Sequence, residues 1–380
     1  MEPLKPNILI LTSHTGGGHV NQAQSLKERL SAWYNVEIVD PHPPFIHRHY
    51  SLLSRRGLRV WDWEYTFFDG KKRGLVFHKA ITLLSWKRLL SAIERVQPQL
   101  IISLHSLISY EVARAVACSG QPIPLVFHFT DLGLTHTTWF TEKNASAYLA
   151  PTREIYAQAL ANGIDANRLY ITGRPVRRQF LLEEDCTSRA ETLASLGLEP
   201  DVFTVFLQGG AEGAAGIQRT IESLFASGVS VQVILAIGKN MRLAAHFAGM
   251  AHVGILPFTD TIAPYMAAAD VIAGKAGASF LTEAFMLEKP FLVTAFIPGQ
   301  EAPNLTFLER HNLGWVCLDP ASQRQLMVHI ISNPAVLAEK LASVRAYKAW
   351  NIAANANLLP VIARLLAEPI PSREEKTAFQ

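Results

Sequence analysis

The sequence predicts an α/β protein built from two doubly wound parallel sheets. Short apolar segments alternate with longer helical stretches along almost the whole chain. Such alternation is typical of parallel strands that are covered by helices on both faces. With 380 residues, of which 49% are hydrophobic and 18% charged, the chain is also long enough for two domains with substantial cores.

Ten strands are expected, five in each half of the chain. Those of the first half are 7–12, 36–40, 100–104, 125–129 and 169–172, and those of the second half are 203–207, 231–237, 253–256, 271–273 and 291–294. The segment 180–200 between them is polar, helical in pattern and free of strand signals. We therefore expect two Rossmann-like domains that face a ligand cleft, with bounds 1–180 and 181–345. Helices at 346–368 and a disordered tail at 369–380 follow.

Cysteine usage and hydropathy indicate the compartment. Cys118, Cys186 and Cys317 are odd in number and widely spaced, so neither a disulfide framework nor a C-x-x-C site is expected. No secretory signal is recognised at the N-terminus, and no apolar run reaches the roughly 18–20 residues that would span a bilayer. We expect a cytoplasmic protein that is soluble or peripheral to a membrane.

The charge is unevenly distributed. The chain has a net charge of +3, yet residues 45–90 contain ten Lys or Arg and only three acidic residues. Aromatic residues are interleaved with these charges, and a helical stripe there predicts either an interfacial helix or a core-facing one. Because each basic residue near an anionic bilayer contributes about 1 kcal/mol, we favour membrane contact over a solvated face. RNA is the rival partner, but no RNA-binding motif accompanies the charge, so no nucleic acid is expected. The candidate membrane residues are Trp61, Trp63, Trp86 and Arg88.

A glycine turn in the second half is the clearest candidate for a phosphate site. The strand at 271–273 is followed by Lys275, Ala276 and Gly277 and then by a helix-forming segment. Small residues let the backbone approach a ligand, and a helix N-terminus presents unpaired N–H groups and a positive dipole end. The dipole contributes only about 0.3–2 kcal/mol per charge, so we expect Lys275 and Arg177 to assist it. The turn predicts a diphosphate site without a metal; the alternative is an ordinary strand-to-helix connection.

Polar residues near this turn are suited to sugar hydroxyls. Glu283 stands one turn into the predicted helix, where it could accept hydrogen bonds from a ribose or could be a solvated carboxylate that complements the dipole. Gln300 and Glu301 follow the strand at 291–294 and offer an amide and a carboxylate at the same end of the sheet. Phe258 could receive a planar base or could pack in the core.

A second glycine segment, Gly16-Gly17-Gly18-His19, follows the first strand. It is not a dinucleotide fingerprint, because Asn21 stands where the third glycine is required, so NAD is not expected. Gly18 permits close approach of a substrate, and a helix N-terminus would lower the pKa of His19 and keep it neutral and able to act as a base. The alternative is a histidine that caps the helix or hydrogen-bonds within the core.

Three further residues follow another first-half strand. Asp131 could orient His19 or an acceptor hydroxyl, or could cap a helix, and His136 lies shortly after it. Trp139 offers a flat surface to a sugar or lipid, or a core side chain. In the second half, Gly210 belongs to a glycine segment that could line the cleft or form a tight turn.

Taken in order, the motifs GGGH, TDL with HTTW, GRPVR, GGAEG, GKAG with TEAF, and IPGQE make the chain resemble the monogalactosyldiacylglycerol synthases and the bacterial processive diacylglycerol glucosyltransferases over residues 14–315. A more distant resemblance is to the N-acetylglucosaminyltransferase of peptidoglycan synthesis. The resemblance implies the two-domain GT-B fold, in which the last helices cross back onto an N-terminal acceptor domain. The C-terminal domain would bind the nucleotide sugar.

The resemblance also implies roles for particular residues. Phe258 and Thr259 would lie near uracil and Glu283 near ribose. The donor sugar and diphosphate would be bound by the remaining donor-site residues, which are Gly18, Arg177, Gly210, Lys275, Ala276, Gly277, Gln300 and Glu301. His19 would be the general base and Asp131 the second candidate, while His136 and Trp139 would belong to the acceptor side. No metal and no cofactor are implied.

The implied reaction is inverting transfer of a hexose from UDP-glucose or UDP-galactose to diacylglycerol or a glycosyl-diacylglycerol, at the cytoplasmic face of the membrane. Two motifs depart from the plant pattern: Ala278-Ser279-Phe280 replaces Pro-Gly-Thr, and the segment 209–213 reads GGAEG for GGGEG. Both lie beside the donor, so the sugar remains open. Alternatives are a transferase for another lipid or a soluble acceptor, a nucleotide-sugar epimerase, and a silent nucleotide-sugar sensor.

Overall fold

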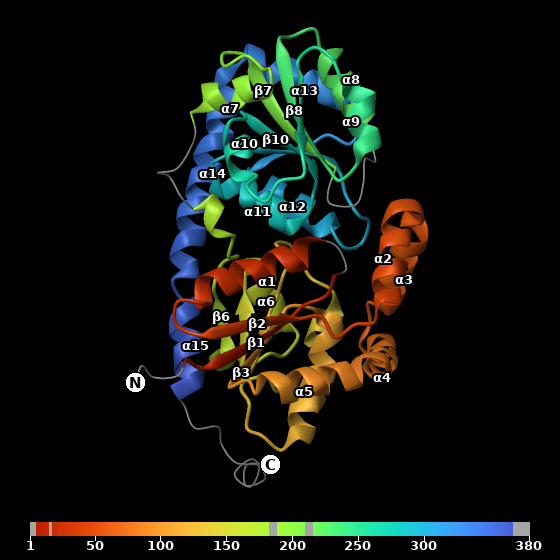
Figure 1. The fold of residues 1–380 in the computed structure, drawn as a ribbon, viewed down its shortest axis with the longest axis vertical. Coiled ribbons are helices and arrows are strands. Elements are labelled where there is room, and N and C mark those ends of the chain that lie inside the picture. The colour runs from red at the N-terminus through yellow and green to blue at the C-terminus, as the bar shows by residue number, and fades with distance from the viewer. Residues whose placement is uncertain (1–4, 15–16, 182–187, 210–215, 368–380) are drawn as a thin grey trace. The chain divides into compact units, whose positions relative to one another are not determined.

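The computed structural model describes residues 5–14, 17–181, 188–209 and 216–367 (Figure 1). The chain divides into two compact units. The first comprises Met1–Leu52, Val60–Arg177 and Asn351–Gln380, and the second comprises Leu53–Arg59 and Arg178–Trp350. Each unit contains one six-stranded sheet, and every strand pair in both sheets is parallel. The predicted α/β class with two doubly wound sheets is confirmed.

The first sheet has the strand order β2-β1-β3-β4-β5-β6. In that order the strands are Asn35–Val39, Asn7–Leu11, Leu100–Ser103, Leu125–His128, Ala147–Ala150 and Leu169–Ile171. Helices α1 (Gly17–Leu30) and α15 (Leu358–Ala367) pack on one face of this sheet. Helices α4 (Lys71–Val96), α5 (Ser106–Ser119) and α6 (Arg153–Ala161) pack on the other face. Because both faces are covered, the strands are nearly continuous apolar runs, as in NILIL of β1.

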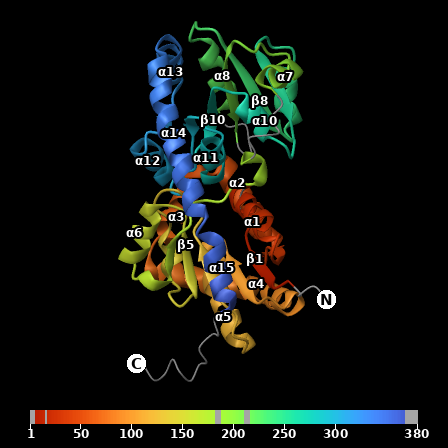
Figure 2. The same ribbon diagram turned by 90° about the vertical axis from the view of Figure 1, so that its left-hand side faces the viewer.

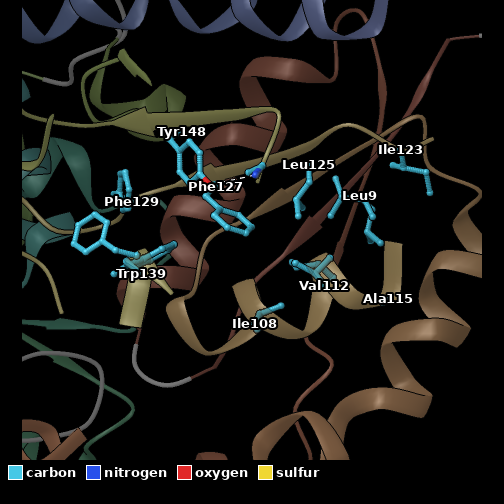
Figure 3. Packing of buried hydrophobic residues seen from close by; sticks show 14 of the residues in the cluster. Leu9, Ile108, Val112, Ala115, Ile123, Leu125, Phe127, Phe129, Trp139 and Tyr148 are labelled. Carbon is cyan, nitrogen blue, oxygen red and sulfur yellow. Dashed lines mark hydrogen bonds between the residues drawn. The ribbon is translucent and has the colours of Figure 1, made fainter. Parts of the chain in front are cut away.

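Aromatic packing fills one face of the first sheet (Figure 3). Phe129 contacts Trp139 with ring centroids 5.3 Å apart, and Phe127 meets Tyr148 at 5.5 Å. Trp139 lies in the short helix η1 (Thr137–Phe140) and is buried. The prediction that it offers a surface to a sugar or lipid is therefore wrong: its indole is part of the apolar core, which is the alternative reading.

The basic and aromatic region forms α2 (Pro44–Arg56), α3 (Leu58–Phe68) and α4. The predicted apolar stripe of α4 faces the core, because Ile93 is buried and Trp86 and Leu90 pack against the same cluster. The predicted stripe also included Leu83, but that side chain is 84% exposed and does not pack on the core. Among the described residues, no helix is long and apolar enough to cross a bilayer.

The second sheet has the order β12-β11-β10-β7-β8-β9. In that order the strands are Gly314–Val316, Phe291–Ala295, Val271–Lys275, Phe203–Gln208, Val231–Gly238 and Val253–Pro257. Helices α8 (Ile217–Phe225), α9 (Met241–Phe247) and α13 (Pro320–Ser332) pack on one face. On the other face, Phe280 of α11 (Ala278–Met286) contacts Phe291 at 5.1 Å. The remaining helices of this unit are α7 (Arg189–Ser195), α10 (Ala263–Ala267), α12 (Ala302–Arg310) and most of α14 (Pro334–Asn355).

The end of α14 belongs to the first unit (Figure 2). The Asn351 side chain accepts the Arg174 backbone N–H at 2.8 Å and donates to the Arg174 carbonyl at 3.0 Å. Gly173, with φ +61°, lies so close that a Cβ there would be 2.7 Å from Asn351 Oδ1. A glycine is therefore required where the helix end meets the segment after β6.

All ten predicted strands are present, with ends shifted by at most two residues. β5 and β12 were not predicted. In each sheet, successive strands of the chain are added on both sides of one position, where the direction of the strand order reverses. This position lies between β1 and β3 in the first sheet and between β7 and β10 in the second. Ligands of open parallel sheets bind outside the carboxyl ends of the strands at such reversals. The glycine segment with His19 follows β1, and the turn 275–277 follows β10, so each glycine segment lies at the reversal of its own sheet.

Candidate functional site

His19 lies in the first turn of α1, where its ring is partly buried. Its Nδ1 is 3.1 Å from the carbonyl oxygen of Leu104 at the end of β3. Because a carbonyl oxygen only accepts, Nδ1 carries the proton and the Nε2 lone pair is left to accept one. The geometry is that of a general base whose tautomer is fixed by the backbone.

The pKa of His19 is lowered to about 4, first by burial and second by the positive charge of Arg174. The ring is therefore neutral at pH 7. The predicted direction of the shift is confirmed, but its cause differs: the side chain loses water and has a buried cation nearby, rather than depending on the helix N-terminus.

Arg174 is a residue that the sequence analysis did not select. It is fully buried, and its guanidinium donates to the carbonyl of Thr130 at the end of β4. The motif GRPVR contains two arginines, and the prediction chose Arg177 for phosphate. Arg177 is partly buried and belongs to the first unit. Arg174 is thus fully buried whereas Arg177 is only partly buried. The positive charge of Arg174 is the one that lowers the pKa of His19.

A row of histidines continues from His19. The rings of His19 and His105 are 4.6 Å apart, and those of His105 and His42 are 5.9 Å apart. His105 caps α5 through its Nδ1, which accepts the Leu107 N–H at 3.2 Å. His105 follows β3 as His19 follows β1, so both flank the reversal of the first sheet. Sequence reasoning missed His105, although its place directly after a predicted strand was the available signal.

Glu111 of α5 is the carboxylic acid next to this row. It is completely buried, accepts a hydrogen bond from the Ser85 hydroxyl, and lies 3.9 Å from His42 Nε2. Burial raises the pKa of Glu111 to about 8, an effect that the Ser85 hydrogen bond reduces and the charge of Asp40 increases. At pH 7 this side chain is largely protonated.

Glu111→Gln should remove a pH dependence of stability. Because the folded-state pKa is raised, the folded protein keeps a proton that the unfolded chain releases above about pH 4.5. The stabilisation is complete below that pH and is lost as the pH rises toward about 8. From about pH 6 to about pH 8 the wild type should lose on the order of 2 kcal/mol relative to the neutral glutamine variant. Urea denaturation of both proteins at the two pH values measures this; parallel changes in both would contradict it.

Asp131 and His136 hold the segment after β4 in shape. Asp131 Oδ2 accepts the Thr135 hydroxyl at 2.7 Å. His136 caps η1, and its Nε2 donates to the Tyr65 carbonyl at 3.0 Å. Burial is the main cause that lowers the pKa of His136. Both His136 ring nitrogens already have protein partners, since Nδ1 lies 2.7 Å from the Thr138 hydroxyl.

In the second unit, the turn after β10 is rigidly built. The Lys275 ammonium pairs with Glu301, whose other oxygen accepts the Ile297 N–H at 2.8 Å. The Asn304 amide donates to the Ala276 carbonyl at 2.9 Å, so a side chain of α12 is hydrogen-bonded to the backbone of the turn. Gly274 has no space for a side chain, because a Cβ would lie 2.2 Å from the Gln208 carbonyl oxygen of β7.

Helix α11 starts directly after this turn with Gly277 as its N-cap. No side chain caps this described end, so its first N–H groups are suited to an anion. Lys275 and the N-terminus of α11 are thus brought together, as the sequence predicted for a diphosphate. The Glu301 carboxylate, predicted to bind sugar, is instead committed to Lys275 and the Ile297 N–H in this structure.

The other donor-site residues differ in exposure. Glu283 is 6% exposed and is therefore not the solvated first-turn carboxylate of the alternative reading. Phe258 is 58% exposed, which excludes core packing, and the Lys239 ammonium lies 5.1 Å from its ring centre. Thr259 and Gln300 are partly buried. Gly210 lies outside the described residues, and Gly18 is exposed at the start of α1.

The candidate membrane residues also differ in exposure and contacts. Trp63 is 63% exposed and stacks on Phe67 with ring centroids 5.2 Å apart. Trp61 is partly buried and packs against Tyr50 at 5.0 Å. Arg88 is exposed, but one of its guanidinium nitrogens donates to the His42 carbonyl at 3.0 Å. Trp86 is only partly exposed, because it packs against the core.

Comparison with known proteins gives two family matches. Residues 19–176 match the model for monogalactosyldiacylglycerol (MGDG) synthase, and residues 204–328 match the model for the glycosyltransferase family 28 C-terminal domain. Monogalactosyldiacylglycerol synthase 1 of Arabidopsis thaliana is 27% identical over 334 residues, which cover 81% of this chain and 61% of that protein. The chain therefore spans about three fifths of the length of this relative.

Solved structures support the fold. MurG of Acinetobacter baumannii aligns with a TM-score of 0.57 at 13% identity, covering 90% of this chain and 95% of that one. Anabaena HepE in complex with UDP and glucose aligns with a TM-score of 0.57 at 14% identity, covering 95% and 100%. At these identities the structures establish a shared GT-B architecture of two Rossmann-like domains. The two family matches and the plant relative together show that the chain is similar to the monogalactosyldiacylglycerol synthases over residues 19–176 and to the family 28 glycosyltransferases over residues 204–328.

Proposed function

We propose that the protein is an inverting glycosyltransferase that moves a hexose from UDP-glucose or UDP-galactose to diacylglycerol or a glycosyl-diacylglycerol. The observation that carries the proposal is the state of His19. Its ring is neutral, its Nδ1 proton is directed at the Leu104 carbonyl, and Nε2 remains as the basic nitrogen. A fixed neutral imidazole after β1 is what deprotonation of an acceptor hydroxyl requires.

The acceptor hydroxyl gives its proton to Nε2 of His19 while its oxygen attacks the anomeric carbon. The bond from that carbon to the diphosphate breaks on the opposite face, so the configuration inverts. Asp131 is the second candidate for the base. The reaction requires the donor sugar to come within reach of His19.

The leaving diphosphate takes on negative charge as the bond breaks. Lys275, the N-terminus of α11 and Arg177 stabilise that charge, and no metal ion is needed for the chemistry. Phe258 and Thr259 contact the uracil, Glu283 the ribose, and Gln300 the sugar. The small residues Gly18, Gly210, Ala276 and Gly277 let the backbone approach the donor.

The acceptor is an uncharged lipid, so the enzyme works at a membrane surface, which we assign to the cytoplasmic face. Exposed apolar side chains of α3 and α4 support this: Trp63 and Phe67 are stacked, Arg73 lies 4.9 Å from the Phe67 ring, and Leu83 projects into solvent. Aromatic, apolar and basic groups together suit an anionic bilayer.

Substituting Trp63 and Leu83 together by serine should weaken binding to vesicles of phosphatidylglycerol. Both side chains are exposed, at 63% and 84%, so the core is unaffected. Since burying one large apolar side chain contributes about 1.5–3 kcal/mol, we expect vesicle affinity to fall by at least about 10-fold. Co-sedimentation measures the effect. The matched control replaces Trp33 and Leu160, two exposed residues outside α3 and α4, by serine. An equal loss of vesicle affinity in the two variants would contradict membrane binding through α3 and α4.

The proposed activity is tested by supplying the purified protein with diacylglycerol vesicles and either labelled donor. We expect a labelled glycolipid with a β linkage, identified by mass spectrometry and by cleavage with β-specific glycosidases. Comparison of the two donors determines the sugar. Conversion of the donor to an epimer without lipid would instead indicate an epimerase. Absence of both UDP release and product would indicate a nucleotide-sugar sensor.

A further inference from the structure

One cluster in the first unit combines two imidazoles with a carboxylate. The side chains of His14, Asp40 and His47 each offer one ligand atom, and these atoms all lie within 4.8 Å of one another. His14 follows β1, Asp40 follows β2, and His47 lies in the first turn of α2 (Figure 1). Three separate segments of the first unit therefore converge on one point, which neither the diphosphate turn nor the base assignment accounts for.

The spacing is close to that of a metal site. Asp40 Oδ2 is hydrogen-bonded to His14 Nδ1 at 2.6 Å and lies 2.9 Å from His47 Nε2. Around a tetrahedral zinc ion, with ligand bonds of roughly 2.0–2.2 Å, neighbouring ligand atoms stand about 3.3–3.6 Å apart. Asp40 Oδ2 would have to move away from both ring nitrogens, by side-chain rotation, to make room for the ion.

The carboxylate is already oriented. Asp40 Oδ1 accepts the His42 backbone N–H at 2.9 Å, and Oδ2 accepts the His14 backbone N–H at 2.6 Å. These bonds direct Oδ2 toward the two imidazoles without using either imidazole. Hydrogen bonds of this kind orient the ligands of metal sites.

His47 provides the second, independent observation. Its Nε2 is buried and, among the described residues, makes no hydrogen bond, although Asp40 Oδ2 is only 2.9 Å away. An ordinary histidine–aspartate pair aligns its N–H with the oxygen. Here His47 Nε2 is close to Asp40 Oδ2 but makes no hydrogen bond with it. This is expected when both atoms are directed at a third atom between them.

We propose that His14, Asp40 and His47 form a binding site for a borderline divalent metal ion, represented by Zn²⁺. Imidazole and carboxylate ligands together suit zinc, whereas Mg²⁺ and Ca²⁺ prefer oxygen ligands alone. Three protein ligands leave a fourth tetrahedral position for water. The His14 side chain is 58% exposed, which gives the ion a path from solvent. The ion would tie the segment leading to α1 to the start of α2, and it is separate from the bond-making step proposed for His19.

The experiment is a Zn²⁺ titration of the full chain, stripped of metal, against a chromogenic chelator. We expect one site, with the affinity reduced by more than about 100-fold in His14→Gln and in His47→Gln. His49→Gln is the matched control, because His49 lies on the same helix but pairs with Glu64 at 3.2 Å. It should bind Zn²⁺ like the wild type. His14 is exposed, so its substitution leaves folding intact, which thermal melting verifies.

X-ray absorption of the zinc-loaded full chain identifies the ligands directly. The proposal expects two imidazole nitrogens and oxygen ligands, with no sulfur. A sulfur ligand would assign the zinc to one of the three cysteines, Cys118, Cys186 or Cys317, and overturn the proposal. Equal zinc affinity in the wild type, His14→Gln and His47→Gln would overturn it as well, as would the absence of binding to the wild type.

Discussion

Replacing His19 with alanine is expected to lower kcat by about 10²–10⁴-fold, the usual contribution of a general base. The acceptor hydroxyl would lose Nε2 of His19, which is free to accept a proton because Nδ1 donates to the Leu104 carbonyl. Turnover of diacylglycerol by the purified variant measures the effect. His246→Ala, an exposed histidine of α9 in the second unit, is the control and should turn over normally.

Two further readouts separate a base from a merely structural histidine. Added imidazole should restore part of the activity of His19→Ala. Because the pKa of His19 is lowered to about 4, the basic form persists as the pH falls, and kcat/KM should change little between about pH 7 and about pH 5 on account of this residue. A loss of kcat/KM centred near the ordinary histidine value of about 6.5, or an unchanged turnover in His19→Ala, would remove His19 from the role.

Lys275→Met should lower kcat/KM for the UDP-sugar by about 10²–10³-fold, as for loss of one group that stabilises a developing anion. Lys275 stands at the carboxyl end of β10 beside the N-terminus of α11. Methionine keeps the length of the side chain and removes the charge. UDP should also inhibit the variant more weakly than the wild type; an unchanged inhibition constant for UDP would contradict the assignment to diphosphate.

The pair of Lys275 with Glu301 allows a sharper test. Glu301→Gln keeps an oxygen for the Ile297 N–H but removes the charge that positions Lys275. If Glu301 acts through Lys275, the double variant should be little worse than Lys275→Met alone, because effects within one pair are not additive. Additive losses would show that Glu301 contacts the sugar independently.

The periodicity of the chain predicted ten of the twelve strands, because each is an apolar run bounded by turn residues and followed by a helical segment. It missed β5, four residues of AYLA, and β12, three residues of GWV. Neither segment stands out from its surroundings as an apolar run bounded by turn residues. They are strands because of pairing across the sheet, of β5 with β4 and β6 and of β12 with β11.

The local sequence determined the two glycine segments, the helix starts beside them and their order along the chain, since these depend on residues that are neighbours in sequence. Only the tertiary structure decided which distant residues meet them. His105 lies next to His19 because β1 and β3 are adjacent in the sheet, and Glu301 lies next to Lys275 although 26 residues separate them. Burial was likewise decided by packing: it placed Trp139 in the core and Arg174 beside His19. The physical reason is that strand order and desolvation depend on contacts across the sheet, which spacing along one segment does not specify.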